Sequence, residues 1–292
     1  MSRQSTGRPH GAATAYIHNE VMTHMHNGHN GSFNNCNLPP WVIASRHFND
    51  NPQMLEIQGV KEGNRFLFDR LTMLDSQEER AMTFNDYMSV KFQLHQWQEH
   101  TDTALKSIRN SYLRYLRGWM MDSNSIEGAV LKRWVESRMG ITPSFHRTRI
   151  KGIHSEEYFE YSVDVMKGSA RTNAIQSQLD MLYEYCQFEL LRKYPHTPAI
   201  SLYRGTYDAN EHEIIEPIDK RCSIVRLNNL VSFTFDEERA WEFGSTVWEV
   251  VVPLSKIFFY NELLPGSIMK GEGEYLVIGG EYRVRQVMCT VG

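Results

Sequence analysis

The sequence predicts an α+β fold in which helices form the first part of the chain and short strands the last part. Apolar side chains recur at intervals of three and four residues up to about residue 193, which is the helical spacing. From Ile200 onward they alternate with polar side chains, as in strands, and Pro195 and Pro198 separate the two patterns. Helices and strands are therefore segregated along the chain, unlike the alternating units of a parallel α/β fold.

Composition limits the classes of partner. The 292 residues include 41% hydrophobic ones, enough for a substantial core, and a net charge of -4 argues against a nucleic acid or an anionic membrane as partner. Cys36, Cys186, Cys222 and Cys289 form no CxxC pair, so we expect reduced thiols and no zinc site. No segment resembles a signal peptide or a membrane span, and we expect a cytoplasmic protein without membrane insertion.

Residues 1–36 are predicted to form a flexible polar arm. Four histidines, His18, His24, His26 and His29, raise the alternative of a metal site, because imidazole is a common metal ligand. They stand among Asn, Gly and Thr without helical or strand periodicity, so nothing would hold them as ligands. We expect an arm and no metal.

Residues 37–195 are expected to form a mainly helical region. Ser76 and Glu79 have the spacing of a capping box, and the apolar pattern after them predicts a helix of about twenty residues ending near His95. Further helices are predicted over residues 105–119, over 126–139 with Gly140 as the C-terminal cap, and over 171–193. The second of these carries a basic face, which is either solvated or meets an acidic partner; its residues are Lys106, Arg109, Arg114 and Arg117.

Residues 196–292 are expected to form the β-rich part of the protein. Short strand-like runs cover residues 200–204, 230–235, 247–252, 256–260, 274–278 and 281–291. A short helix is predicted between Asp236 and Gly244, and a turn at Gly279 and Gly280. Glu281, which follows this turn, is expected to be structural.

Arg204 is the first candidate site residue. It shares a strand face with Ile200 and Leu202, so its guanidinium should point to the core or to a cleft. There it would either pair with a carboxylate across the sheet or bind a diphosphate, for which the planar fork of Arg is well suited. Gly205 beside it would let a carboxamide such as nicotinamide approach the backbone.

Ser232 and Thr234 form the second candidate pair. Strand alternation puts both hydroxyls on one face and Phe233 on the other. Hydroxyl groups that face a core need hydrogen-bond partners, and a ribose or a catalytic carboxylate could supply them. Thr234 could instead cap the helix near Asp236.

Glu272 and Glu274 form the third candidate pair. They share a face two residues apart, directly before a run of apolar residues. Two close carboxylates repel each other, which tends to separate their pKa values and their roles. Glu274 could stabilise positive charge on a ribose as nicotinamide leaves, and Glu272 could take a proton from an acceptor guanidinium. An exposed acidic loop is the alternative.

These three motifs resemble the Arg, Ser-x-Thr and Glu-x-Glu signature of arginine-specific mono-ADP-ribosyltransferases. Over residues 37–291 the chain is also similar to the dinitrogenase reductase ADP-ribosyltransferase family. The segments that carry this resemblance read NLPPWVIASRHFN, SYLRYLRGW, EGAVLKRWVESR, RTNAIQSQLDMLYEYCQFELLR, LYRGT, LNNLVSFTFD, AWEFGSTVWE and EYLVIGGEYRV.

The resemblance implies more than the residue spacing does. It implies a C-terminal split β-sandwich with an NAD cleft, NAD as co-substrate, and transfer of ADP-ribose to one arginine of dinitrogenase reductase, the iron protein of nitrogenase. This transfer switches nitrogenase off when ammonium is plentiful or energy is short. It also implies activation by a PII-type nitrogen signal protein. It assigns catalysis to Glu272 and Glu274, and NAD binding to Arg204, Gly205, Ser232 and Thr234. It does not identify the residue that stacks on nicotinamide, for which Tyr207 and Phe243 are candidates.

Three alternatives stay open at this point. The chain could be a non-catalytic NAD-responsive binding protein, an arginine ADP-ribosyltransferase with another protein target, or a glycosidase-like hydrolase that uses the paired acids. Arg204 argues against the hydrolase, because a sugar without phosphate does not need that cation. The helical region, residues 37–195, is expected to recognise the target and the regulator.

Overall fold

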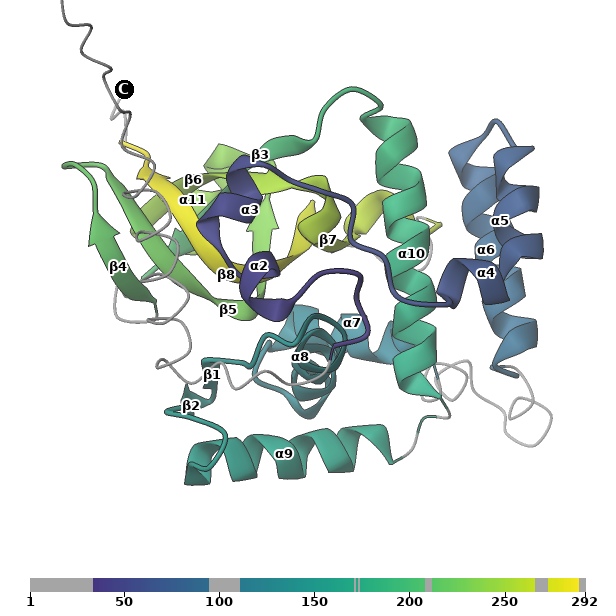
Figure 1. The fold of residues 1–292 in the computed structure, drawn as a ribbon, viewed down its shortest axis with the longest axis horizontal. Coiled ribbons are helices and arrows are strands. Elements are labelled where there is room, and N and C mark those ends of the chain that lie inside the picture. Colours follow the sequence, from purple (N-terminus) through teal and green to yellow (C-terminus); the bar gives the residue numbers. More distant parts are fainter. Residues whose placement is uncertain are drawn as a thin grey trace, which may run out of the picture.

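Figure 1 shows the computed structural model, which describes residues 34–94, 111–170, 172, 174–207, 212–265 and 273–288. Of the predicted N-terminal arm, only residues 34–36 are described. The helices before the sheet are α2 Pro40–Ile43, α3 Arg46–Asp50, α4 Val60–Gly63, α5 Arg65–Thr72, α6 Gln77–Lys91, α7 Tyr112–Met121, α8 Ile126–Met139, α9 Glu156–Ser169 and α10 Ile175–Lys193. A small hairpin, β1 Phe145–His146 and β2 Thr148–Arg149, lies between α8 and α9.

The main sheet has six antiparallel strands in the order β4-β5-β3-β6-β8-β7. They are β3 Ala199–Thr206, β4 Glu213–Pro217, β5 Cys222–Thr234, β6 Thr246–Pro253, β7 Ile257–Tyr260 and β8 Glu274–Gln286. The short helix α11 Glu237–Glu242 and the 3-10 turns η3 Leu254–Lys256 and η4 Asn261–Leu263 connect them. The long strands β5 and β8 also pair with each other, so β5, β3, β6 and β8 close into a small barrel.

The helix signals in the sequence are mostly confirmed. Ser76 caps α6 by accepting from the backbone N–H of Glu79, although this helix ends at Lys91, earlier than predicted. Helix α8 begins and ends as predicted, and Gly140 takes the left-handed conformation at φ 72°. Helix α9, capped by Ser155, was not predicted.

The turn predicted at Gly279 and Gly280 is wrong, because both residues lie inside the continuous strand β8. The partner strand β5 carries a bulge between Leu227 and Leu230 at this level. A side chain at Gly279 would overlap the carbonyl group of Asn228 in this bulge. Gly279 therefore permits close strand approach, whereas Gly280, at φ 112°, lies against the backbone of Ala44 between α2 and α3.

The predicted basic face is only partly solvated. Arg114 is half-buried, forms an ion pair with Glu127 of α8, and lies over the ring of Tyr115. Arg117 is exposed, whereas Lys106 and Arg109 lie outside the described residues. Arg114 thus holds α7 against α8.

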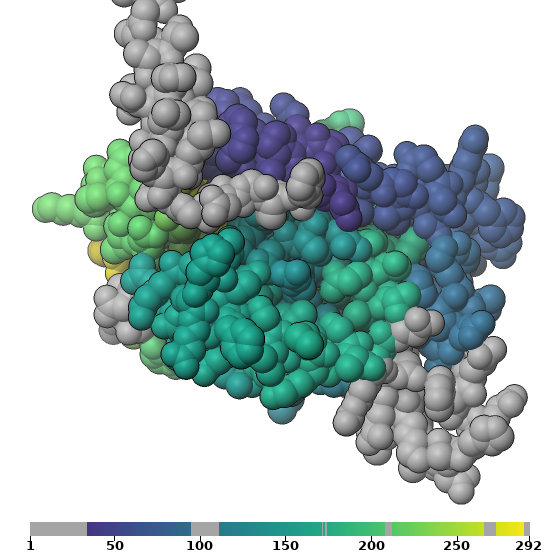
Figure 2. All heavy atoms as spheres, turned by 60° about the horizontal axis from the view of Figure 1, so that its bottom comes forward, coloured from purple at the N-terminus to yellow at the C-terminus, as the bar shows by residue number. Residues whose placement is uncertain are grey.

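Helices cover the sheet on several sides (Figure 1). Helix α10 lies beside β7, α8 beside β5, and α3 beside β8, while α9 packs on the outer side of α8. One hydrophobic cluster runs through both the helical and the β-rich parts, from Cys36 to Val284. Figure 2 shows residues of the helical part covering most of one face of the molecule, with strand residues visible at its left edge. Within the described ranges, no helix is both long and apolar enough to cross a membrane.

Candidate active site

A pocket of about 650 Å³ lies where β3, β5 and the start of β8 meet helices α7, α8 and α11. Its volume is in the range typical of small-molecule sites, roughly 300–1,000 Å³. Five of the six predicted site residues line it: Arg204, Gly205, Ser232, Thr234 and Glu274. The sixth, Glu272, lies outside the described residues.

Strand pairing explains why these residues meet. Thr234 of β5 lies opposite Glu274 of β8, and Ser232 lies opposite Leu276. Directly opposed residues point to the same face of a sheet, so both hydroxyls and the Glu274 carboxylate face one side. Arg204 of β3 reaches across to β5 and donates from Nη1 to the carbonyl oxygen of Ser232 at 2.8 Å.

The hydroxyl groups of Ser232 and Thr234 have different protein partners. Ser232 Oγ accepts from Nε1 of Trp119 at 2.9 Å. Thr234 Oγ1 accepts from the backbone N–H of Asp236 at 3.2 Å. The alternative that Thr234 caps α11 is wrong, because the capping side chain is that of Asp236, which accepts from the backbone N–H groups of the second and third residues of this helix, Glu238 and Arg239.

Gly205 has a packing reason for lacking a side chain. A Cβ atom at this position would overlap the carbonyl oxygen of Ala240 in α11. Strand β3 and helix α11 can therefore approach only at a glycine. The two aromatic residues suggested for nicotinamide stacking, Tyr207 and Phe243, line the pocket and are 74% and 51% exposed.

His212 lines the pocket and was not predicted from the sequence. It is buried, and its ring lies 5.4 Å from that of Trp248. Burial, together with the positive charge of Arg204, lowers the pKa of His212 to about 3. The imidazole is therefore neutral at physiological pH, which leaves Arg204 as the fixed cation on this side of the pocket.

Lys132 and Trp119 bring the helical part into the pocket wall, and neither was predicted as a site residue. Lys132 is 1% exposed, and its Nζ donates to Asn124 Oδ1 and to the carbonyl oxygen of Phe145, both at 3.1 Å. The same ammonium group lies 5.8 Å from the ring centre of Trp119. Burial lowers the pKa of Lys132 to about 7. In the sequence, Trp119 follows a helical pattern that is typical of core packing, and Lys132 is a lysine within the next predicted helix.

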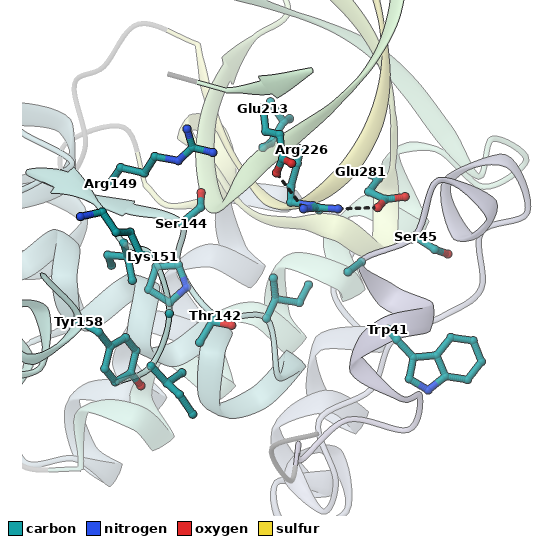
Figure 3. Close-up of a pocket in the computed structure, with 18 residues that line it drawn as sticks. Trp41, Ser45, Thr142, Ser144, Arg149, Lys151, Tyr158, Glu213, Arg226 and Glu281 are labelled. Carbon is teal, nitrogen blue, oxygen red and sulfur yellow. Dashed lines mark hydrogen bonds and ion pairs between the residues drawn. The ribbon is translucent and has the colours of Figure 1, made fainter. Parts of the chain in front are cut away.

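A second pocket, of about 500 Å³, contains none of the predicted site residues (Figure 3). Arg226 lies between two carboxylates in it, 2.8 Å from Glu213 and 3.2 Å from Glu281. The backbone N–H of Glu281 also donates to the carbonyl oxygen of Ala44 at 2.7 Å. These contacts fit the structural role expected for Glu281, because they tie β4, β5 and β8 to the segment between α2 and α3.

The first pocket has the chemical groups that NAD needs. The guanidinium of Arg204 suits a diphosphate, the hydroxyls of Ser232 and Thr234 suit a ribose, and the Glu274 carboxylate suits positive charge developing on that ribose. No group of three or more metal-binding side chains occurs in the part of the chain that the structure describes.

Comparison with known proteins gives two matches that cover most of the chain. A sequence model of the family described as dinitrogenase reductase ADP-ribosyltransferase matches residues 33–286. A protein of Rhodospirillum rubrum named NAD(+)--dinitrogen-reductase ADP-D-ribosyltransferase is 45% identical over 259 residues, which are 87% of this chain and 94% of that protein. No solved structure matches.

Proposed function

Because the chain belongs to the dinitrogenase reductase ADP-ribosyltransferase family, we propose that it transfers ADP-ribose from NAD to dinitrogenase reductase. NAD is a co-substrate in this reaction, and the enzyme is a glycosyltransferase that moves a pentosyl group. One structural observation carries the proposal. Residues of three strands, with Arg204, Ser232, Thr234 and Glu274 among them, line a single pocket of suitable size.

Each residue has a distinct task in the proposed reaction. Arg204 binds the diphosphate, and Ser232 and Thr234 orient the ribose. The bond between ribose and nicotinamide breaks and nicotinamide leaves with the bonding electrons, while Glu274 stabilises the positive charge left on the sugar. The acceptor nitrogen then forms the new bond to the ribose, and its proton passes to Glu272.

Several finer points of the proposal rest on the family resemblance of the sequence. They are an arginine as the acceptor, a PII-type nitrogen signal protein as activator, a cytoplasmic location, and recognition of the target by residues 37–195. The strands around the pocket would correspond to the split β-sandwich of ADP-ribosyltransferases, with this pocket as their NAD cleft. What supports this assignment is that strands β3, β5 and β8 all contribute residues to the pocket.

Transfer of label from biotinylated or radiolabelled NAD to purified dinitrogenase reductase tests the proposal. The wild-type protein should label dinitrogenase reductase, and Glu274→Gln should be slower by about a hundredfold to a thousandfold, because it loses a preorganised negative charge. No transfer by the wild type would reject the enzymatic function. Transfer by Glu274→Gln at the wild-type rate would reject the catalytic role of the Glu274 carboxylate but not the enzymatic function of the protein.

A further inference from the structure

The hydrogen bond between Trp119 and Ser232 joins two distant parts of the chain inside the pocket. Trp119 belongs to helix α7 and Ser232 to strand β5, and their separation is 113 residues in the sequence. The indole nitrogen lies 2.9 Å from the serine oxygen, and the Trp119 side chain is almost fully buried at 3% exposure. A partly buried hydrogen bond of this length, made by a buried indole, holds both groups in a defined orientation.

The direction of this bond follows from the chemistry of the two groups. An indole N–H can only donate, so Ser232 Oγ must be the acceptor. The serine hydroxyl has a single proton, which is then available for a different partner. The neighbouring carbonyl oxygen of Ser232 already accepts from Arg204, and a guanidinium accepts no hydrogen bond. The serine proton is thus directed away from both Trp119 and Arg204.

Glu274 is the acceptor that the strand register offers. Ser232 pairs with Leu276, and Glu274 lies two residues from Leu276 on the same face. Diagonal neighbours of this kind are roughly 7–8 Å apart, a distance that a long side chain such as glutamate can span. Ser232 and Glu274 both line the pocket, so a bond between them would be made at the reacting end of NAD.

We propose that Trp119 is a positioning residue of the transferase site, whose indole N–H orients the Ser232 hydroxyl so that it donates to Glu274. This proposal rests on the proposed function. If Trp119 has this role, the helical part of the chain contributes a residue to the catalytic site, in addition to any surface that binds the target protein. The ammonium group of Lys132, 5.8 Å from the centre of the Trp119 ring, adds a second contact that holds the indole.

A double-mutant cycle of Trp119→Phe and Ser232→Ala tests this role. Trp119→Phe keeps an aromatic ring but removes the donor, so we expect kcat to fall about tenfold for both NAD hydrolysis and protein labelling, with little change in the KM for NAD. In the Ser232→Ala background, the same substitution should have no further effect. An equal fall of kcat in both backgrounds would overturn the proposal.

Trp134→Phe is the matched control. Trp134 is fully buried and donates from Nε1 to Asp180 at 2.8 Å, but it does not line the pocket. This variant should have a lower melting temperature and an unchanged kcat. If Trp119→Phe does not fold, Trp119→Leu takes its place in the cycle. Leu also lacks a donor, so it should lower kcat in the wild-type background and have no further effect with Ser232→Ala, and an equal fall in both backgrounds would reject the proposal.

The outcomes separate this inference from the proposed function. If the wild type transfers no label, the proposed function fails. If the wild type is active, Glu274→Gln is inactive and Trp119→Phe has wild-type kcat, only the positioning role of Trp119 fails.

Discussion

Replacing Lys132 with Met should change how the stability of the protein depends on pH. Lys132 is buried in the wall of the candidate active-site pocket, and burial lowers the pKa of its ammonium group from 10.5 to about 7. Between these two pH values the unfolded chain binds a proton that the folded protein does not bind. The stability contributed by this residue therefore rises with pH in this interval. Met has a similar length and no titrating group.

The size of the effect follows from the pKa difference. A full proton difference is worth about 1.4 kcal/mol per pH unit. From about pH 7.5 to about pH 9.5, the free energy of unfolding of the wild type should gain about 2–3 kcal/mol relative to Lys132→Met. At lower pH the variant has its greatest relative stability, because it avoids burying a charge. The variant also loses the hydrogen bonds of the ammonium group. This loss shifts its free energy of unfolding by a constant and leaves the dependence of the difference on pH unchanged.

Urea unfolding of both proteins at several pH values and constant ionic strength measures this difference. Other groups titrate in the same interval, since burial raises the pKa values of the Cys36 and Cys186 thiols. Their contributions are common to both proteins and cancel in the difference between the two free energies. A difference that stays constant from about pH 7.5 to about pH 9.5 would refute the reasoning, because Lys132 would then titrate alike in both states.

Two further predictions follow from buried contacts. Gly205→Ala should lower the melting temperature and the rate of label transfer, because its Cβ would overlap the carbonyl oxygen of Ala240 and displace α11 at a cost of about 1–3 kcal/mol; an unchanged melting temperature would contradict this. Lys256 is fully buried with a pKa lowered to about 7. Lys256→Met should therefore reduce the gain of stability with pH in urea unfolding, while the pH profile of label transfer stays as in the wild type, since Lys256 does not line the pocket.

Local chemistry made parts of the fold predictable. A serine cap and a C-terminal glycine act on their own helix, so the bounds of α8 could be predicted from Ile126 to Gly140. Helix α9 was missed because it lies on the outside of α8 and buries only a narrow face that includes Tyr161. The continuity of β8 at Gly279 depends on a bulge in β5, which is a distant segment of the chain.

The candidate site also combines residues that local motifs predict with residues that depend on contacts between distant segments. The strand residues Arg204, Ser232 and Glu274 belong to short motifs whose order in the sequence resembles that of a known family, and strand pairing brings them together. Trp119 and Lys132 come from helices whose pattern is that of ordinary core positions. Their place in the pocket depends on how α7 and α8 pack against β5. A local sequence pattern does not predict such packing between distant elements.

The closure of the barrel by β8 has a consequence for the making of the enzyme. Among the described strands, β8 comes last in the chain, and it supplies both Glu274 and the pairings that join β5 to β6. The ribosome synthesises the chain from its N-terminus to its C-terminus. A growing polypeptide therefore contains the helices and Arg204 before it contains strand β8. Partly synthesised chains therefore lack the strand that closes the barrel and completes the wall of the pocket. Under the proposed mechanism they also lack the Glu274 carboxylate, so the pocket is complete only after this last described strand has been made.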